Sequence, residues 1–309
     1  MHHYHAFGLR IESELALPEL HPGDGGACDV SVRIATAAAG ERPTRWIEGA
    51  GNRVILNLDD IRFEVTDGKR ILILAPPDTS QNDIRVWLMG TVMAALLNQR
   101  GYFALHGNMV ALPGGGAAAF SGTSGAGKST IAGLLERDGF RVLGDDLCAI
   151  QLAPDGRPMI HAGIPRLKLW GETLDLLGRP SGGLERVATS IRKFHVPLGS
   201  HQEEGSLDPI ALERIYLLDR SERPGEPLIQ PLDGASAAGA VLANAFRWGI
   251  GQLVAGDGSR TQFDQALSIA RHARVFRLAR RWGTDQLFGE AEAIAAHLRN
   301  SDADGGAGS

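Results

Sequence analysis

Cysteine, excess charge and long apolar runs are all scarce in this chain. Its two cysteines, Cys28 and Cys148, belong to no CxxC pair, so the sequence predicts neither a disulfide framework nor a cysteine-based zinc site. We expect both thiols to be reduced, with Cys148 a small core residue. The longest apolar stretch, residues 86–97, is broken by Gly90 and Thr91. Because a membrane-spanning helix needs about 20 apolar residues, this stretch predicts a buried helix.

Charge of one sign is equally scarce. The 31 Lys and Arg residues against 36 Asp and Glu residues leave a formal net charge of −5. We therefore expect no nucleic-acid partner, because no basic field is available to hold phosphates, and no membrane partner. Residues 1–5 contain no basic segment followed by an apolar run, so we expect a cytoplasmic protein. His2, His3 and His5 could contact a metal, but an exposed, frayed terminus is the favoured interpretation.

The first 81 residues have the pattern of a β-rich N-terminal lobe. Turn residues separate runs rich in β-branched residues, which predict strands at residues 30–34, 54–58, 61–65 and 71–74. Asp67-Gly68 between two such runs predicts a hairpin, and we expect an antiparallel sheet. After residue 81 the spacing of the apolar residues becomes that of a helix. Asn82 or Asp83 can cap this helix, which continues to Arg100.

Residues 82–299 predict a second domain with an α/β fold and a mixed sheet. Short apolar segments predict strands at residues 103–105, 109–112, 117–120, 140–144, 148–152 and 215–218. Helices are predicted at residues 129–137, 235–246, 261–272 and 285–298. Gly, Ser, His and Pro are frequent in residues 180–208, which predicts a long loop, and residues 300–309 predict a disordered tail.

Residues 122–129, Gly-Thr-Ser-Gly-Ala-Gly-Lys-Ser, fit the GxxxxGK[ST] pattern of a phosphate-binding loop between a strand and a helix. Glycines let backbone N–H groups turn toward phosphate oxygens, and the helix adds the positive end of its dipole. We expect Lys128 to reach the β- and γ-phosphates of ATP, and the Ser129 hydroxyl to bind Mg²⁺. The residues expected to bind the nucleotide are Gly122, Thr123, Ser124, Gly125, Ala126, Gly127, Lys128, Ser129 and Thr130.

Asp145 and Asp146 follow the strand predicted after this loop and its helix. About ten helical residues carry the chain roughly 15 Å away from the loop, and five strand residues bring it back roughly 16 Å. The pair should therefore lie beside the loop. One carboxylate there could bind Mg²⁺ and the other could take the proton from an attacking hydroxyl. The alternative is that the pair is only a polar strand exit.

Together these features resemble the catalytic domain of the HPr kinase/phosphorylase family. His106-Gly107, the glycine-rich loop and the aspartates occur in the family's order, and the aspartates follow Lys128 at the family's spacing of 17 and 18 residues. The match is close over residues 103–150, although the family typically has an acidic residue at the position of Thr123.

The resemblance implies an ATP- and Mg²⁺-dependent serine kinase built around a P-loop. Lys128 and Ser129 would take the phosphate and Mg²⁺ roles, and Asp145 would support the metal. Asp146 matches the family's proton acceptor for the target serine hydroxyl. His106 matches a histidine beside the nucleotide phosphates, although a histidine after a strand is by itself more often structural.

The segment after the aspartates departs from that family. The family's glutamate metal ligand near an Arg-Gly-hydrophobic-Gly motif is absent from the sequence, and the residues Ala-Gly-Ile-Pro-Arg-Leu-Lys-Leu-Trp at 162–170 stand in its place. This replacement argues against a reverse phosphorylase activity. The segment and residues 4–20 instead resemble HPr-kinase-like proteins that tailor ribosomal peptides. In lasso-peptide clusters such kinases phosphorylate a C-terminal serine of the precursor.

Phosphoryl transfer needs more positive charge than one lysine supplies, because charge develops on the transferred group. The candidates are Arg166, Lys168, Arg192 and Lys193. We expect Lys193 and Arg166 to take part in catalysis, although each could be a solvated surface charge. A basic stretch at residues 271–281 is either a solvated face or a surface for an acidic partner.

The leading hypothesis is an ATP- and Mg²⁺-dependent serine kinase whose acceptor is a peptide or small protein, such as a lasso-peptide precursor. A kinase for a small-molecule hydroxyl is one alternative. A non-catalytic nucleotide-binding regulator is another, although two aspartates beside the loop favour an enzyme. The sequence leaves open whether the chain forms a homo-oligomer.

Overall fold

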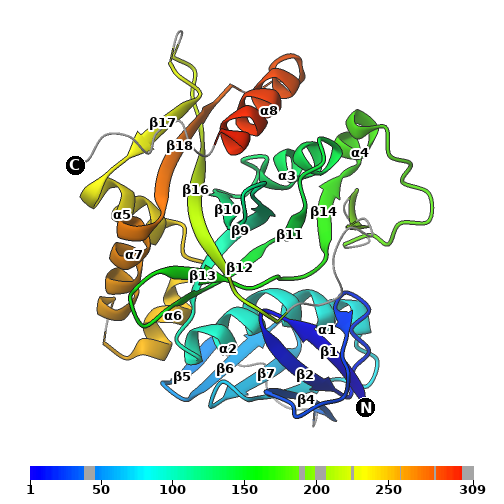
Figure 1. Cartoon of the computed structure of the whole chain (residues 1–309). Coiled ribbons are helices and arrows are strands. Elements are labelled where there is room, and N and C mark those ends of the chain that lie inside the picture. Colours follow the sequence, from blue (N-terminus) through cyan, green and yellow to red (C-terminus); the bar gives the residue numbers. More distant parts are fainter. Residues whose placement is uncertain are drawn as a thin grey trace.

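The computed structural model describes residues 1–37, 46–187, 192–198, 207–223, 226–257, 259–281 and 283–300. Two eight-stranded β-sheets dominate these residues, and a two-stranded sheet accompanies them. A helical segment lies between the two large sheets, and further helices cover the second sheet (Figure 1). The fold is therefore a mixture of α and β structure with a β-rich N-terminal region, as the sequence predicts.

The N-terminal sheet is mixed, so the expectation of a wholly antiparallel sheet was wrong. β7 and β8 do form the predicted hairpin, with φ values of 56° at Asp67 and 62° at Gly68. β4, however, runs parallel to both β2 and β8, because long connections can return the chain in the same direction. The strand order is β3–β1–β2–β4–β8–β7–β6–β5. Its strands are β1 (His2–Ala6), β2 (Leu9–Ser13), β3 (His21–Pro22), β4 (Val30–Thr36), β5 (Ile47–Ala50), β6 (Arg53–Leu58), β7 (Ile61–Thr66) and β8 (Arg70–Ala75).

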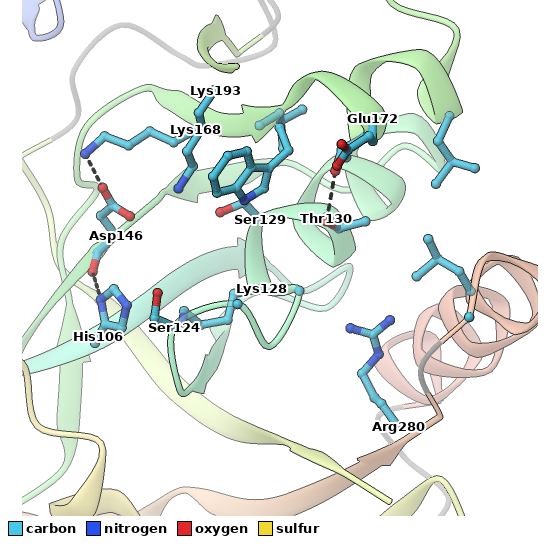
Figure 2. Close-up of a pocket in the computed structure, with 18 of the residues that line it drawn as sticks. His106, Ser124, Lys128, Ser129, Thr130, Asp146, Lys168, Glu172, Lys193 and Arg280 are labelled. Atoms are coloured by element: carbon cyan, nitrogen blue, oxygen red, sulfur yellow. Dashed lines mark hydrogen bonds and ion pairs between the residues drawn. The ribbon is translucent and has the colours of Figure 1, made fainter. Parts of the chain in front are cut away.

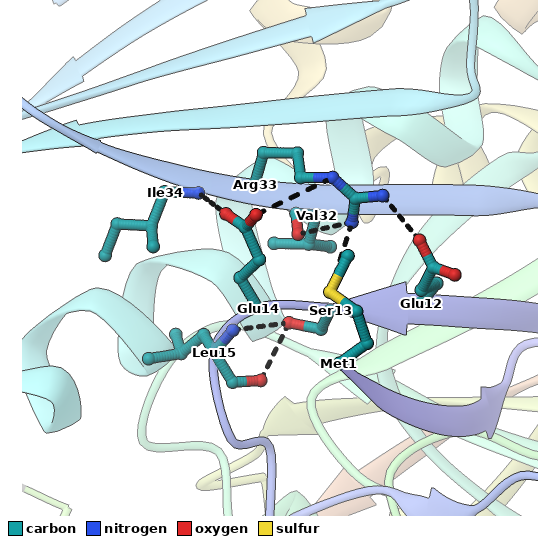
Figure 3. A network of polar contacts seen from close by, with 8 residues as sticks. All are labelled: Met1, Glu12, Ser13, Glu14, Leu15, Val32, Arg33 and Ile34. Atoms are coloured by element: carbon teal, nitrogen blue, oxygen red, sulfur yellow. Dashed lines mark hydrogen bonds and ion pairs between the residues drawn. The ribbon is translucent and has the colours of Figure 1, made fainter.

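The N-terminal residues form a strand and not the frayed terminus that the sequence favoured. β1 pairs with β2 across a tight turn in which Phe7 and Gly8 have φ values of 56° and 73°. Glu12 of β2 accepts a hydrogen bond of 2.5 Å from Arg33 of β4, which fastens the first hairpin to the rest of the sheet (Figure 3). Because three of the five residues of β1 are histidines, its sequence shows no alternation of apolar and polar residues, and the strand was not predicted.

One helical segment packs between the two large sheets. It consists of α1 (Gln81–Trp87), the π-helical turn η1 (Leu88–Val92) and α2 (Met93–Gln99). The predicted helix is thereby confirmed, and Gly101 follows its end with a φ of 80°. The buried residues of this segment share a core with N-terminal strands and with Leu147 and Ala149 of the second sheet. The N-terminal lobe and the remainder of the chain are therefore packed together across residue 81.

The second sheet carries the glycine-rich loop, and the predicted mixture of strand directions is confirmed. β10 runs parallel to β16 and antiparallel to β9. The strand order is β10–β9–β12–β13–β16–β18–β17, with β11 paired to β9 and an additional β10–β16 pairing that closes the first five strands into a ring. Its strands are β9 (Phe103–Ala111), β10 (Ala117–Gly122), β11 (Val142–Gly144), β12 (Leu147–Leu152), β13 (Pro158–Ile160), β16 (Ile210–Arg220), β17 (Ile229–Leu232) and β18 (Arg274–Arg280).

Helices cover both faces of this sheet. On one face, Phe120, Tyr216 and Phe276 of three adjacent strands stack with ring centroids 4.9 and 5.2 Å apart, beneath α3 and α8. α5 and α7 pack on the opposite face. The helices of this part are α3 (Lys128–Arg137), α4 (Gly171–Leu177), α5 (Gly234–Ala243), α6 (Trp248–Ala255), α7 (Arg260–His272) and α8 (Thr284–Arg299). The sequence indicated neither α4 nor α6, and β18 lies within the stretch interpreted only as basic.

A two-stranded antiparallel sheet, β14 (Arg166–Trp170) and β15 (Lys193–Pro197), lies beside α3. One of its faces contributes Leu167, Leu169, Phe194 and Val196 to the core under α3 and α8. The prediction of a long loop over residues 180–208 was therefore wrong at β15, which pairs with β14 and buries Phe194 and Val196 in that core. The remainder of that loop lies partly outside the described residues, as does the predicted tail after Asn300.

Both cysteines are free thiols, as expected, and Cys148 is a buried core residue. Burial raises the pKa of the Cys148 thiol, which suits a structural residue. In the parts of the chain that the structure describes, no helix is long and apolar enough to cross a membrane.

Candidate active site

The glycine-rich loop joins β10 to α3 and needs glycine for its backbone conformation. Gly122, Gly125 and Gly127 have φ values of 145°, 82° and 87°, a region that residues with a Cβ rarely occupy. A Cβ on Gly127 would also come within 2.4 Å of a guanidinium nitrogen of Arg280. The loop therefore depends on glycine at both fixed glycine positions of the sequence pattern, Gly122 and Gly127.

Lys128, the first residue of α3, is held by the loop that precedes it. Its side-chain Nζ donates hydrogen bonds to the carbonyl oxygens of Gly122 at 2.8 Å and Thr123 at 2.9 Å. Only 8% of the residue is exposed, and burial lowers the pKa of its ammonium group. Since an ammonium group has three donors, Lys128 can make these two bonds and still contact an anion above the loop.

Asp145 lies against the start of α3, as the helix and strand lengths predict. The hydroxyl of Ser129 donates to a carboxylate oxygen of Asp145 at 3.0 Å, and the backbone N–H of Lys168 donates to the same oxygen at 2.9 Å. Asp145 is 3% exposed. Burial, and then the negative charge of Asp146, raise the pKa of its carboxyl group. A nearby cation would stabilise the negative charge of a carboxylate that is buried beside a second carboxylate.

Asp146 interrupts the pairing of its strand with β9. β11 and β12 both pair with β9, and the two aspartates lie between them. Asp146 has a φ of 68°, in the left-handed region that few residues other than glycine occupy and that aspartate tolerates better than most. Its carboxylate forms an ion pair with Lys168. Burial alone would raise the pKa of Asp146, but the charge and hydrogen bond of Lys168, together with the charges of Lys193 and His106, hold the pKa below its usual value.

His106 supports the backbone of Asp146. Its ring Nδ1 lies 3.0 Å from the carbonyl oxygen of Asp146, and because a carbonyl only accepts, Nδ1 carries the proton. Burial, and then the charge of Lys128, lower the pKa of His106, so the ring is neutral near pH 7 with its Nε2 lone pair available. The adjacent Gly107 lets β9 and β10 meet closely, since a Cβ there would lie 2.2 Å from the carbonyl oxygen of Phe120.

A cavity of about 860 Å³ brings these groups together (Figure 2). His106, Asp146 and Lys168 lie at one end of it, Lys128 and Ser129 lie near its middle, and Arg280 lies at the other end. Of the nine residues expected to bind nucleotide, six line the cavity: Ser124, Gly125, Gly127, Lys128, Ser129 and Thr130. Gly122, Thr123 and Ala126 belong to the same loop but do not line it.

The end of the cavity near Arg280 contains residues that the sequence did not single out. Arg280 ends β18, where its guanidinium donates to Glu290 at 2.9 Å and to the carbonyl oxygen of Ala126 at 2.9 Å. Leu176 of α4 and Leu287 of α8 also line the cavity. The basic stretch at residues 271–281 was the available signal, but only the pairing of β18 with β16 brings Arg280 to the loop.

Two of the four candidate basic residues line the cavity over the glycine-rich loop, and two do not. Lys193 lines the cavity, with its Nζ 5.7 Å from the ring centroid of Trp170, and Lys168 lines it as well. Arg166 does not: it is paired with Glu19 at 3.3 Å and lines a separate cavity. Arg192 forms an ion pair with Asp175 at 3.2 Å and lies outside the cavity lining. Arg166 lies farther from the phosphate loop because it comes four residues before Trp170 on the same face of β14.

Hard oxygen ligands suited to Mg²⁺ meet at Ser129 and Asp145. Mg²⁺ in phosphoryl-transfer sites commonly binds one or two carboxylates, a hydroxyl, substrate phosphates and water. Among the described residues no group of three or more His, Cys, Asp or Glu is placed to bind a metal ion by itself. The donor set therefore fits an ion that arrives with phosphate oxygens, and does not resemble a closed zinc site.

Comparison with known proteins identifies no family for this chain. No protein-family model matches it, and no curated protein matches it. Among solved structures it is similar to the Hpr(Ser) kinase/phosphatase from Coxiella burnetii, with a TM-score of 0.32 and 10% sequence identity over 64% of this chain and 88% of that chain. A similarity at this level does not by itself establish a shared fold or a shared function.

Proposed function

We propose that this chain is a kinase that uses ATP and Mg²⁺ to phosphorylate a serine hydroxyl of a peptide or small protein. The observation that carries this proposal is the meeting of the Asp145-Asp146 pair with the glycine-rich loop. Ser129 lies 3.0 Å from Asp145, while Asp146 and Lys128 line one cavity. A lasso-peptide precursor is one acceptor of this kind, and its support comes from the sequence resemblance alone.

The cavity has room for the two substrates at opposite ends. We place the triphosphate over the glycine-rich loop and Lys128, with the nucleoside toward Leu176, Leu287 and Arg280. The acceptor serine then enters at the end that contains Asp146, Lys168 and His106. Ser129 and Asp145 would hold Mg²⁺ against the phosphates, where the ion would offset charge on the transferred group.

The transfer itself needs a proton acceptor and fixed positive charge. The serine oxygen forms a bond to the γ-phosphorus, the bond from that phosphorus to the bridging oxygen of ADP breaks, and the serine proton passes to the carboxylate of Asp146. The low pKa of Asp146 keeps its carboxylate ionised at neutral pH, so that it can accept a hydrogen bond from the serine hydroxyl before the proton moves. Lys128, Lys168 and Lys193 supply positive charge around the transferred group.

The two alternatives are less well supported by the same site. A regulator that only binds nucleotide has no need for a second carboxylate with an unusual φ and its own lysine partner. A small-molecule kinase would need the acceptor end to be enclosed, yet Trp170 in this cavity is 46% exposed. An exposed aromatic residue in the cavity lining suits a polypeptide acceptor better.

The proposal can be tested by incubating the protein with γ-labelled ATP, Mg²⁺ and a library of serine peptides, followed by mass analysis of the products. We expect label on serine, and Lys128→Ala should reduce it by about 10²–10³-fold because one charge on the phosphates is lost. Lys69→Ala, which removes an exposed lysine in the β7–β8 turn, is the matched control. Wild-type turnover in Lys128→Ala at an unchanged melting temperature would overturn the phosphate-loop assignment. Label on no peptide in the wild type would overturn the choice of acceptor.

A further inference from the structure

A second cavity of about 490 Å³ follows the first along one face of the β14–β15 hairpin. Three cross-strand pairs share this face: Trp170 with Lys193, Lys168 with His195, and Arg166 with Pro197. The first pair and Lys168 line the cavity over the glycine-rich loop, whereas His195 and the last pair line the second cavity. Successive pairs on one face are about 7 Å apart, so the two cavities are neighbours.

Three residues that line the second cavity carry buried polar atoms without partners in the described part of the chain. His195 is 5% exposed, and neither of its ring nitrogens has a hydrogen-bond partner among the described residues. Nε of Arg166 and the second carboxylate oxygen of Glu19 also have no hydrogen-bond partner among the described residues. Leaving such an atom buried and unpaired is energetically costly. Four of them in one cavity indicate a site for a ligand that both donates and accepts hydrogen bonds.

The charges around this cavity are balanced. Glu19 pairs with Arg85 at 2.7 Å and with Arg166 at 3.3 Å, and Glu185 pairs with Arg85 at 3.0 Å. Two guanidinium groups thus face two carboxylates. Burial, followed by the charge of Arg166, lowers the pKa of His195 to about 3, so its ring is neutral. A neutral ligand therefore fits better than an ion.

The remaining wall is mostly apolar: besides His21 and Gly183, it comes from Pro18, Pro165, Leu184, Pro197 and Leu198. A primary carboxamide combines the required properties, because it is neutral and has two donors and an acceptor. Attached to a short aliphatic stem, it would place the amide at His195 and the stem against the prolines. Among the side chains of proteins this description fits asparagine and glutamine.

We propose that the second cavity binds the acceptor polypeptide by an asparagine or glutamine side chain two residues from the phosphorylated serine. The proposal rests on the kinase function proposed above. An extended peptide presents residues i and i+2 on the same side, roughly 6.6–6.8 Å apart. That repeat matches the step along the hairpin from Lys168, which faces Asp146, to Arg166 in the second cavity.

The test uses serine peptides that differ only at the two positions two residues from the serine, with Asn, Gln, Asp, Lys, Leu or Ala at each. For the wild type we expect Asn or Gln on one side of the serine to lower the KM at least tenfold relative to Leu. His195→Phe keeps a ring of similar shape but removes both nitrogens. It should abolish this preference with kcat unchanged, and His195→Gln should restore part of it.

Stability provides a second readout that a structural histidine would not give. Since the ring nitrogens of His195 have no protein partner among the described residues, His195→Phe should melt at the same temperature as the wild type or higher. His161→Phe is the matched control, because His161 is also buried but is bonded to Gln151 and to the carbonyl of Leu207. It should lower the melting temperature without changing the peptide preference.

The outcomes separate the two proposals. Phosphorylated peptides with no preference at either position, or a preference that survives in His195→Phe, would overturn the second site and leave the kinase assignment standing. A wild type that phosphorylates no peptide would overturn the kinase acceptor, and this site with it. If His195→Phe does not fold, the preference of the wild type for Asn or Gln still tests the second site.

Discussion

The hydroxyl of Ser129 lies 3.0 Å from the carboxylate of Asp145, although one residue lies in the first turn of α3 and the other follows β11. The contact exists because α3 carries the chain away from the glycine-rich loop, and the residues after it, which end in the three-residue strand β11, bring the chain back. It joins a residue of the phosphate-loop pattern to the first residue of the aspartate pair. The chemistry proposed for the site depends on this contact, and so do the first two predictions.

Asp145→Asn should stabilise the protein at neutral pH while impairing its activity. Folding raises the pKa of Asp145, so the folded state binds this proton more tightly than the unfolded state, and stability falls as the pH rises above the ordinary carboxyl value of 3.8. Asparagine carries no such proton, so the variant does not lose this stability as the pH rises. Melting curves in EDTA should show a higher melting temperature for the variant at pH 7, by about 2–4 °C per kcal/mol, and no gain near pH 4. A lower melting temperature at pH 7 would contradict this account.

Asp146→Asn and Asp145→Asn should differ in their response to Mg²⁺. Asp146→Asn cannot accept the serine proton, so turnover should fall about 10²–10⁴-fold with little change in affinity for ATP and Mg²⁺. Asp145→Asn should weaken Mg²⁺ affinity and lose less activity at saturating metal. Both are measured in Mg²⁺ titrations with a serine peptide. If Asp145→Asn is the more damaging at saturating Mg²⁺, the two roles are reversed.

Lys168→Met should move the acidic side of the pH–rate profile to higher pH. Lys168 is the ion-pair partner of Asp146 and lowers its pKa, so removing the charge raises that pKa. Since the ionised form of Asp146 is the active one, activity should then be lost at a higher pH than in the wild type. The measurement is kcat/KM between pH 4 and pH 8. Lys193→Met should shift the profile less, because Lys193 acts on Asp146 only through its charge. Superimposable profiles for Lys168→Met and wild type would remove Asp146 from the role of base.

His106→Ala should reduce turnover less than Lys128→Ala does. His106 holds the backbone carbonyl of Asp146 through one hydrogen bond, and losing such a bond costs about 0.5–1.5 kcal/mol, or roughly 2- to 12-fold in rate. The KM for ATP should be unchanged, because His106 acts on the position of Asp146. Steady-state kinetics and a melting curve check this prediction. An unfolded variant would show that the histidine is structural only.

Local sequence patterns determined much of the candidate site. The glycine-rich loop requires positive φ at Gly122 and Gly127, and this requirement is visible in the residue types themselves. The placement of Asp145 followed from the lengths of one helix and one strand, since both span known distances per residue. The hairpin at Asp67-Gly68 was predictable for the same reason, because two residues define its turn. The proposed roles of these site residues remain predictions.

Only the tertiary structure determines which residues surround the glycine-rich loop and the aspartate pair. Arg280 reaches the loop because β18 pairs with β16, and Lys168 rather than Arg166 faces Asp146 because the backbone N–H of β14 that bonds to Asp145 belongs to Lys168. No pattern within β14 or β18 states which distant strand will be its partner. Pairings over tens of residues depend on how all the apolar faces are buried together, and only the folded chain resolves that competition.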